Sequence, residues 1–534
     1  MTPLSADLSA GFRNPVLPGF HPDPSVCRVG TDFYLVTSTF EWFPGLPVWH
    51  SRDLVHWRPI GHVLDRPEQL PLDGVRPSGG LYAPTIRWHA GRYYVVCTLV
   101  DGPPGRSGSF LVTATNPAGP WSQPVLLEGP GGFDPSLFFD TDGSAWYCAT
   151  RPLSRPDPGG RTEIYLRELD LATHTLTGPE HVLWHGALVD AVWSEGPHLY
   201  RVDGRYYLLT SEGGTEHNHA VTVARGDRIT GPYQGNPANP SLTHRQLGRG
   251  RPVVGVGHAD LVRTAHNEWW AVLLGTRPDA EGRHNLGRET FLAPVRWEDG
   301  WPVFCAGVGQ VLLDQPTAPA LDPHPWPPTP VRDDFTGDRL GPEWNVLRTP
   351  RETWWDLSAR PGHLRLHLRP DPVGERTQPS LVARRQQHWS FRAATALDFT
   401  PAGPAECAGL VLLQNDAHQL RFLVHGSDSG AHRELRAVRR AGGVDEPVAV
   451  VALPPGPVEL GVRAGGQDYR FGYRLGAGSW QHVTTMDGSV LSTQVAGGFT
   501  GAFLGLYAAT TDDGRPSRSV ADVDWFDYEP VDVD

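Results

Sequence analysis

A pattern repeated five times in residues 23–271 is the strongest constraint on how this chain folds. Each copy has a polar lead residue, an apolar run, a turn and an aromatic-rich stretch. The copies are DPSVCRVGTDFYLV from Asp23, YAPTIRWHAGRYYV from Tyr82, DPSLFFDTDGSAWY from Asp134, EGPHLYRVDGRYYL from Glu195 and HADLVRTAHNEWWA from His258. They begin 52 to 63 residues apart, which suits a four-stranded unit with long loops. The repeat therefore predicts a five-bladed β-propeller.

The residue nine positions after each lead residue is a turn former. These residues are Asp32, Gly91, Gly143, Gly204 and Asn267. When the copies are aligned on them, the lead residues share one position at the start of the innermost strand of each blade. The innermost strands of a propeller surround its central axis, so we expect the five lead residues to converge at one end of that axis.

Three of the five lead residues are carboxylic acids: Asp23, Asp134 and Glu195. Buried acids repel one another and are costly without partners, so three in one place indicate a function. A single Asp-Pro pair would more often mark a solvated turn. With no cysteine cluster or phosphate-binding loop nearby, the chemistry that best uses several carboxylates is glycoside hydrolysis. In that reaction one acid protonates the leaving oxygen and another activates water.

The composition agrees with an all-β chain of two or more domains. The 534 residues are 39% hydrophobic and 10% aromatic, and the 61 glycines and 52 prolines suit a chain with many turns. The net charge of −13 and the lack of a basic run argue against nucleic acid and anionic membranes as partners and favour a neutral ligand. Five cysteines scattered singly indicate buried apolar side chains, and neither a disulfide framework nor a zinc site.

The N-terminal stretch MTPLSADLSAGFRNP has no basic start followed by an apolar core. No apolar run in the chain approaches the length of a membrane span. We therefore expect a cytoplasmic protein with no membrane partner, and we expect it to be a homo-oligomer.

The stretch STFEWFPG, residues 38–45, supplies aromatic side chains that suit a sugar pocket. Phe40, Trp42 and Phe43 would offer faces for stacking on the apolar faces of a sugar ring. Ordinary core packing is an equal alternative for these residues.

Five ordered motifs resemble the family-43 glycoside hydrolases. The nearest likeness is to the β-xylosidase and α-L-arabinofuranosidase branch that carries a C-terminal β-sandwich, and it extends over nearly the whole chain. The motifs are NPVLPGFHPDPS (14–25), GGFDPSLFFDTDG (131–143), SEGPHLYRVDGRYYLLTSEGGTEHNHAVTVAR (194–225), GHADL (257–261) and LGRETFLAPV (286–295).

The resemblance implies an inverting mechanism with three acids in separate roles. Asp23 matches the general base, Glu195 the general acid, and Asp134 the residue that tunes the acid and positions the substrate. Arg288 matches the arginine that grips hydroxyls of the terminal sugar. His258 matches a histidine at the propeller centre that in some members lies beside a bound calcium ion or its water shell. We expect no required cofactor and assign no metal site, which leaves a calcium ion near His258 open.

Aromatic residues complete the expected substrate site. Tyr82 stands in SGGLYAP where many relatives carry tryptophan, which allows sugar stacking but changes the pocket shape. Phe40 is expected on the pocket wall. In that family branch a loop of the sandwich helps to close the pocket, and either Phe499 or Phe503 in GGFTGAFLG would be the residue that reaches over it. The alternative is that both belong to the sandwich core.

The chain divides into two predicted domains. Residues 1–315 form the catalytic propeller, residues 316–330 a stiff proline-rich linker, and residues 331–534 a concanavalin-like or jelly-roll-like β-sandwich packed on the propeller. The segments GHLRLHLRP, AGLVLLQND, HQLRFLVHG and AFLGLYAAT alternate apolar and polar residues, as strands of a sandwich do.

The expected function is exo-acting, inverting hydrolysis that releases terminal xylose from β-1,4-xylo-oligosaccharides, with α-L-arabinofuranosidase side activity. A primary α-L-arabinofuranosidase is one alternative, and a non-catalytic carbohydrate-binding propeller is another. The retaining fructan-cleaving enzymes are disfavoured because the chain has no NDPNG-type motif. The insertion RPEQLPLDGVRPSGG, residues 66–80, is expected to help make the site a pocket closed at one end.

Overall fold

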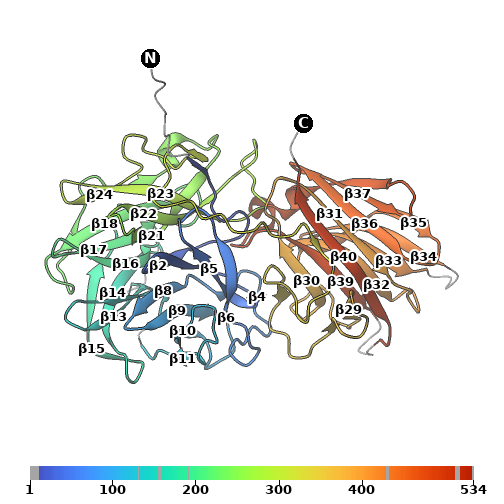
Figure 1. Cartoon of the computed structure of the whole chain (residues 1–534), viewed down its shortest axis with the longest axis horizontal. Helices are drawn as coiled ribbons and strands as arrows, with labels where there is room; N and C mark the ends of the chain where they lie inside the picture. Colours follow the sequence, from blue (N-terminus) through green and yellow to red (C-terminus); the bar gives the residue numbers. More distant parts are fainter. Residues whose placement is uncertain are drawn as a thin grey trace, which may run out of the picture.

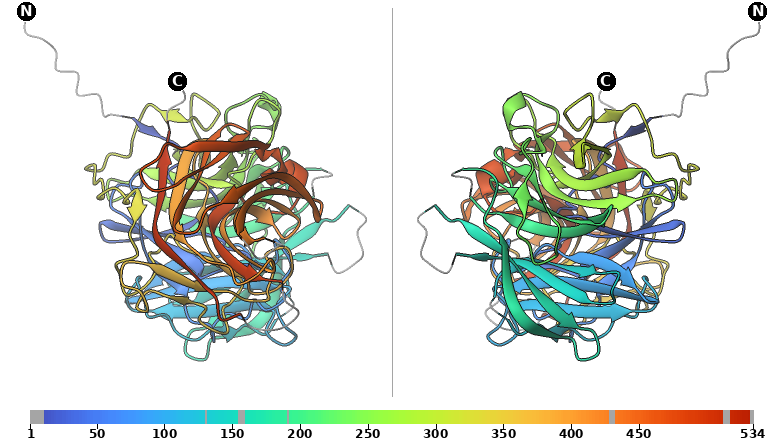
Figure 2. Two further views of the ribbon diagram at one scale, coloured as in Figure 1. Left: turned by 90° about the vertical axis from the view of Figure 1, so that its right-hand side faces the viewer. Right: turned by 90° about the vertical axis from the view of Figure 1, so that its left-hand side faces the viewer.

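The computed structural model describes residues 11–129, 131–153, 159–189, 192–427, 432–511 and 517–531. These residues form two β-rich parts that lie side by side, the earlier part of the chain on the left of Figure 1 and the later part on the right. Seen from either end of the long axis, one part covers the other (Figure 2). The expectation of an all-β protein is confirmed, and among the described residues no helix is long and apolar enough to span a lipid bilayer.

The first part contains five antiparallel sheets. The first sheet has β2 (Ser25–Val29), β3 (Asp32–Val36), β5 (Gly45–Ser51) and β6 (Arg58–Leu64). The second has β7 (Gly80–Leu81), β8 (Thr85–His89), β9 (Arg92–Val100), β10 (Gly108–Ala114) and β11 (Val125–Leu126). The third has β12 (Phe133–Phe139), β13 (Ala145–Pro152), β14 (Thr162–Asp170) and β15 (Thr175–Trp184). The fourth has β16 (Glu195–Val202), β17 (Arg205–Glu212), β18 (Ala220–Gly226), β19 (Gln234–Gly235) and β20 (Leu242–Thr243). The fifth has β21 (Val254–Arg263), β22 (Trp269–Thr276), β23 (Glu289–Glu298) and β24 (Trp301–Phe304).

The innermost strands of these sheets make a closed ring. Strand β2 contacts β8, β8 contacts β12, β12 contacts β16, β16 contacts β21, and β21 returns to β2. Sheets arranged around a common axis in this way form a β-propeller. The ring is tied by β1 (Phe12–Arg13), which pairs with β25 (Asp314–Gln315), and by an isolated bridge between Leu17 and Thr290. The 3₁₀ helix η1 (Arg245–Leu247) lies in a connecting loop.

A buried ion pair at the centre of the ring joins four of the five sheets. Arg87 in β8 donates from Nη1 to Oδ2 of Asp260 in β21 at 2.8 Å, and its Nη2 lies 3.0 Å from Nδ1 of His198 in β16. Asp260 also accepts a 2.7 Å hydrogen bond from Ser25 at the start of β2. Since a buried charge is stable only when it is paired and hydrogen-bonded, this cluster holds the inner strands in one arrangement.

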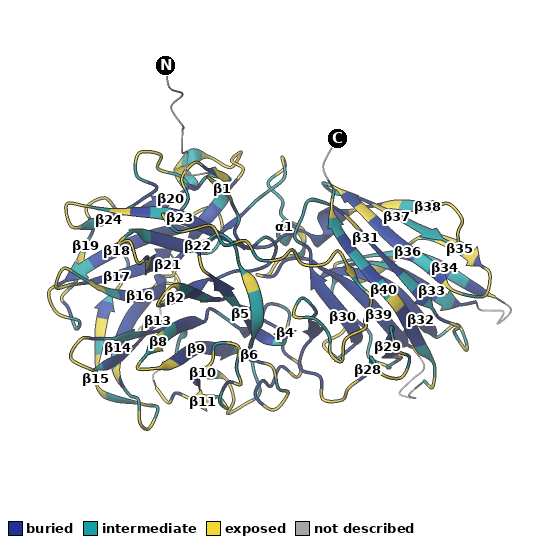
Figure 3. Cartoon of the chain, in the orientation of Figure 1, coloured by how far each residue is buried: buried dark blue, intermediate teal, exposed yellow. Residues whose placement is uncertain are grey.

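The second part is a sandwich of two sheets. One sheet runs in the order β28 (Trp355–Asp356), β29 (Leu364–His367), β40 (Val520–Pro530), β31 (Ser390–Asp398), β36 (Val458–Gly465), β37 (Asp468–Arg474) and β38 (Gln481–Asp487), with β26 (Arg332–Asp333) paired to β40. The other runs β30 (Ser380–Arg385), β39 (Phe503–Thr510), β32 (Glu406–Asn415), β33 (His418–Gly426), β34 (Arg433–Ala441) and β35 (Val444–Leu453). The 3₁₀ helix η2 (Gly488–Leu491) and helix α1 (Thr493–Ala496) follow β38. The strands expected from alternating residues are confirmed, and in both parts the inner strands are buried and many connecting loops are exposed (Figure 3).

The two parts share a continuous apolar interface. Strand β4 (Trp42–Phe43) pairs with β27 (Val346–Leu347), and the ring of Trp42 stacks on Phe503 with the centroids 3.7 Å apart. Fully buried Arg348 donates from Nε to the carbonyl oxygen of Val75 at 2.8 Å. Trp42 and Phe43 therefore belong to this interface: of the two alternatives for them, core packing holds and a place on the wall of a sugar pocket does not.

The proline-rich connection lies against the first sheet. Trp326 donates from Nε1 to the carbonyl oxygen of His56 at 3.2 Å, and the guanidinium carbon of Arg58 lies 3.8 Å from the centroid of the Trp326 ring. The backbone amide of His324 donates to the Asp53 carboxylate at 2.7 Å. All five cysteines are buried and free, as expected.

Trp42→Ala tests the interface between the two parts. Removing the buried ring leaves a cavity against Phe503, so we expect the free energy of unfolding in urea to fall by about 3–5 kcal/mol. Trp88→Ala is the matched control, because Trp88 is 41% exposed on β8. Its effect should stay within about 0.5 kcal/mol. Equal losses in the two variants would contradict this account of the interface.

Candidate active site

The three predicted acids lie where innermost strands begin. Asp23 precedes β2 by two residues, Asp134 is the second residue of β12, and Glu195 is the first residue of β16. All three are buried. The ladder of β12 is irregular between Phe133 and Ser136, around Asp134, and that of β16 is irregular just after Glu195. Such bulges re-aim side chains, here at the ends of strands that meet around the axis.

A left-handed backbone marks the equivalent position in four of the five sheets. The φ angle is 54° at Asp23, 51° at Asp134, 56° at Gly196 and 49° at His258. Few residues other than glycine adopt such angles, so their recurrence at one position is a property of the inner strands. In each of these sheets the hairpin turn begins seven residues later.

This geometry corrects the predicted alignment of two copies. Gly196 occupies the position equivalent to Asp23, so Glu195 stands one residue ahead of it, and Ala83, not Tyr82, is the equivalent residue in the second sheet. The alignment on turn formers failed because these residues do not hold one place in the hairpin: Gly91 and Gly204 are the second residue of a two-residue turn, whereas Asp32 is already the first residue of β3. A shift of one residue changes where a side chain points.

Gly196 brings two of the sheets into contact beside the acids. A Cβ atom at this position would lie 2.9 Å from Cε1 of His258, so only glycine fits both the space and the backbone angle. The Gly196 amide donates to Oδ2 of Asp134 at 3.2 Å. The residue after Glu195 thereby holds Asp134, and the sequence motif alone gave no sign of this role.

Asp23 is surrounded by groups that favour its ionised form. It accepts hydrogen bonds of 2.6 Å from Nη1 of Arg288 and 2.6 Å from Oγ of Ser38, and Nδ1 of His258 lies 3.9 Å from its Oδ1. Burial by itself would raise the pKa of Asp23. The charges of Arg288 and His258 and the Ser38 bond outweigh burial and lower that pKa.

Glu195 is held in its protonated form by its surroundings. Burial raises its pKa well above the usual value, and the negative charges of Asp134 and Asp23 raise it further, against an opposite effect of Arg288. Burial likewise raises the pKa of Asp134 to about 6, with His258 lowering it and Asp23 raising it. The site therefore separates one ionised acid from one protonated acid, the arrangement that acid and base catalysis by two carboxyl groups requires.

Arg288 connects the acids to three aromatic rings. Its guanidinium carbon lies 5.5 Å from the ring centroid of Phe40 and 5.9 Å from that of Phe499. The Phe40 and Tyr82 rings are 5.2 Å apart, and the Phe499 ring lies 6.0 Å from Phe40 and 6.3 Å from Tyr82. The structure thus brings the predicted binding residues together beside Asp23.

The structure distinguishes the two sandwich phenylalanines. Phe499 is 36% exposed, and its backbone amide donates to Oγ of Ser78 at 2.8 Å. Phe503 is fully buried in β39 and stacks on Trp42. Phe499 is therefore the residue that reaches from the sandwich toward the acids, and Ser78, in the insertion of residues 66–80, fixes its backbone.

A small pocket of about 30 Å³ opens beside Arg288 and Phe499. Its other lining residues come from both parts of the chain, and they include Thr215, Glu216, His284 and Gln494. Polar groups and one aromatic ring thus surround a small opening where the two parts of the chain meet.

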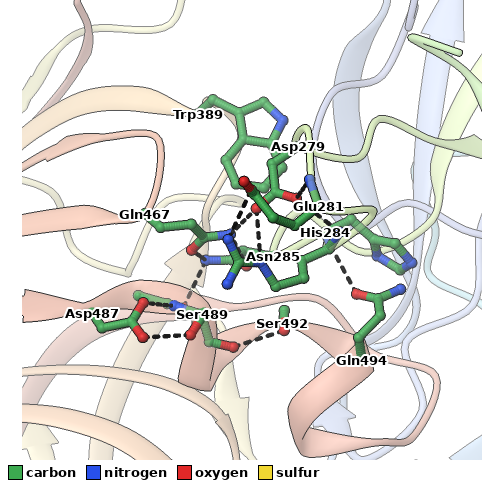
Figure 4. A network of polar contacts seen from close by, with 12 residues as sticks. Asp279, Glu281, His284, Asn285, Trp389, Gln467, Asp487, Ser489, Ser492 and Gln494 are labelled. Atoms are coloured by element: carbon green, nitrogen blue, oxygen red, sulfur yellow. Dashed lines mark hydrogen bonds and ion pairs between the residues drawn. The ribbon is translucent and has the colours of Figure 1, made fainter. Parts of the chain in front are cut away.

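The segment that carries Arg288 is anchored in the sandwich (Figure 4). Asn285 is fully buried, and its Nδ2 lies 3.0 Å from Oε1 of Gln467 and 3.1 Å from the hydroxyl of Tyr469. The backbone amide of His284 donates to Oε1 of Gln494 at 2.9 Å. The position of Arg288 thus depends on both parts of the chain, and no sequence signal pointed to Asn285.

The side chains around His258 are poor ligands for calcium. Across the part of the chain that the structure describes, no three or more His, Cys, Asp or Glu side chains are grouped so as to hold a metal ion. Calcium takes six to eight oxygen ligands, whereas the His258 ring offers nitrogen. The side chains there do not form a calcium cage, and no step proposed below uses a metal.

The comparisons with known proteins agree along the whole chain. Residues 12–302 match the pattern described as glycosyl hydrolases family 43, and residues 332–529 match the β-xylosidase C-terminal concanavalin A-like domain. A xylosidase/arabinosidase of Butyrivibrio fibrisolvens is 42% identical over 97% of this chain and 99% of its own length. A non-reducing end α-L-arabinofuranosidase of Bacteroides ovatus is 40% identical over 98% of this chain and 95% of its own.

Solved structures give the same result. A xylan β-1,4-xylosidase of Bacillus halodurans has a TM-score of 0.91 at 37% identity, with 97% of this chain and 100% of that chain covered. A family-43 protein from a Bacteroides ovatus xyloglucan locus also has a TM-score of 0.91, at 40% identity and with the same coverage. With this agreement in sequence and fold, the chain belongs to family 43 of the glycosyl hydrolases and is a glycoside hydrolase with a C-terminal concanavalin A-like domain.

Proposed function

We propose that this enzyme is an exo-acting, inverting β-xylosidase that releases terminal xylose from β-1,4-xylo-oligosaccharides, with α-L-arabinofuranosidase side activity. The observation that carries the proposal is that two buried acids of one site differ in pKa. The pKa of Asp23 is lowered, which favours its ionised form, and the pKa of Glu195 is raised, which favours its protonated form. The names of the similar proteins supply the two sugars. A primary α-L-arabinofuranosidase is the second candidate, favoured by the name of the Bacteroides ovatus relative.

In the proposed mechanism the Asp23 carboxylate takes a proton from a water molecule. The water oxygen attacks the anomeric carbon on the face opposite the leaving group, and the bond from that carbon to the glycosidic oxygen breaks. Glu195 gives its proton to that oxygen, so inversion leaves Asp23 protonated and Glu195 ionised until both exchange protons with solvent. Asp134 raises the pKa of Glu195, and Arg288 holds Asp23 and hydroxyls of the terminal sugar.

Further proposals concern the substrate site and the organisation of the chain. His258, Phe40, Tyr82 and Phe499 would surround the terminal sugar together with Arg288. Each of the five sheets would be one blade of a five-bladed propeller in residues 1–315, joined through residues 316–330 to the sandwich of residues 331–534; the gap between the matched regions supports this division. Assembly into a homo-oligomer stays a prediction, which sedimentation equilibrium tests.

Hydrolysis of xylobiose and xylotriose tests the proposed reaction. Proton NMR should show α-xylose as the first sugar released from the non-reducing end, because attack by water inverts the β-linkage. Xylotriose should give only xylose and xylobiose at early times, since a pocket closed by the segment around Phe499 accepts one chain end. Initial release of β-xylose would contradict inversion, and failure to release xylose beside rapid cleavage of an arabinofuranoside would favour the second candidate.

Glu195→Ala and Asp23→Ala test the division of labour between the acids. Loss of a general acid should lower kcat/KM on xylobiose by about 10²- to 10⁴-fold, and much less on an activated dinitrophenyl β-xyloside whose leaving group needs no proton. Asp23→Ala should slow both substrates alike, because the water then lacks a base. The same leaving-group dependence in both variants would refute these roles.

Asp134→Asn tests the electrostatic role of the third acid. The alkaline limb of the kcat/KM profile reports loss of the Glu195 proton, and the Asp134 anion raises that pKa. Removing the anion should move the alkaline limb to lower pH, although burial keeps part of the shift. Because the pKa of Asp134 is about 6, the difference in kcat/KM between this variant and the unmodified enzyme should be present above about pH 6, where Asp134 is ionised.

The control for this profile is Asp142→Asn, which removes an exposed carboxylate from the β12–β13 turn of the same sheet. Its profile should match that of the unmodified enzyme. An unchanged alkaline limb in folded Asp134→Asn protein would mean that Asp134 only positions the substrate.

A further inference from the structure

Trp193 is an exposed aromatic residue two positions before Glu195. Its side chain is 45% exposed, whereas Glu195 is buried. Its φ angle is 44°, in the left-handed region that bulky side chains rarely adopt. Strained residues of this kind persist where the surrounding structure holds them, and they cluster at ligand sites.

The neighbouring hairpin holds Trp193 in place. Glu195 pairs with Ser211 in the β16–β17 ladder, and the ladder continues beyond it because the amide of Gly213 donates to the carbonyl oxygen of Val192 at 2.8 Å. The six-membered ring of Trp193 faces Gly214, where a Cβ atom would lie 3.3 Å from two ring carbons. Glycine at this position leaves space for the ring.

The same hairpin leads directly to the substrate site. Thr215 and Glu216, which follow Gly214, line the pocket that Arg288 and Phe499 also line. The Trp193 ring therefore lies beside the residue that precedes these two pocket residues, and it belongs to the segment that carries Glu195. In the proposed mechanism Glu195 protonates the oxygen between the two sugars. The leaving sugar carries that oxygen away, so it must bind on the side of the site where Glu195 lies.

We propose that Trp193 is a specificity-determining residue that stacks on the leaving sugar of an oligosaccharide substrate. The inference rests on the proposed function and adds a binding contact beyond the cleaved bond. A rigid aromatic face exposed beside buried polar groups suits the apolar face of a pyranose ring. The contact would favour substrates whose leaving group is a sugar over those whose leaving group is small.

The test compares two substrates that share the terminal xylose. Xylobiose leaves a sugar, whereas β-xylosyl fluoride leaves only fluoride. Trp193→Asn removes the ring and keeps a residue that tolerates the left-handed backbone, so kcat/KM for xylobiose should fall about 3- to 10-fold. For the fluoride it should stay unchanged. Trp193→Phe should retain most of the xylobiose activity, and Trp88→Ala, at an exposed tryptophan on β8, should change neither value.

Three other results would overturn the inference. Equal loss on both substrates would mean that the ring supports the segment of Glu195, and no loss on xylobiose would mean that it touches no sugar. If the unmodified enzyme cleaved the fluoride but released no xylose from xylobiose, the proposed function would fail and the inference with it.

Discussion

The hydrogen-bonded ion pair between Arg288 and Asp23 is the interaction on which the candidate site depends. Three buried acids in one place would all tend to hold their protons, because burial disfavours every negative charge. The guanidinium of Arg288, 2.6 Å from Asp23, is the largest of the influences that keep this acid ionised, and His258 and Ser38 add to it. The charge on Asp23 then helps to keep the proton on Glu195. The chemical difference between the acids thus depends on how closely each one approaches Arg288 and on its other partners.

The rest of the fold can be understood as support for that pair. The Arg87–Asp260 cluster fixes the inner strands from which the acids project, and left-handed residues aim the side chains. On the other side, Asn285 ties the segment of Arg288 to the sandwich through Gln467 and Tyr469. The sandwich therefore contributes Phe499 directly and Arg288 indirectly.

The sequence revealed the acids because two of them recur in the same DPS context. It misaligned Tyr82 and Glu195 by one residue, because the residues taken as turn formers lie inside the turn in those two hairpins and just after it in the first. It could not decide between pocket wall and core packing for Trp42 and Phe43, since aromatic composition does not tell which side of a segment faces a neighbouring domain. For the same reason the sequence could not tell whether Phe499 or Phe503 reaches the site. The two residues are four positions apart in one glycine-rich stretch.

Contacts between distant segments had no local pattern to reveal them. Nothing in the sequence around Asn285 distinguishes it from other loop asparagines, because its hydrogen-bond partners are 182 and 184 residues away. Ser38 is equally ordinary in sequence, yet it binds Asp23 across 15 residues. Such partners follow from how separate segments pack, within the propeller for Ser38 and between propeller and sandwich for Asn285, and alternation of apolar residues predicts only the layers.

The anchoring of Arg288 by the sandwich also bears on how the enzyme acquires activity as it folds. Asp23, Arg288 and Phe499 come from the beginning, middle and end of the chain, so a nascent polypeptide lacks a complete site until nearly all of it has left the ribosome. A half-made chain would carry the acids without the ring and the anchored arginine beside them. Hydrolytic activity during refolding would consequently report the docking of the sandwich on the propeller.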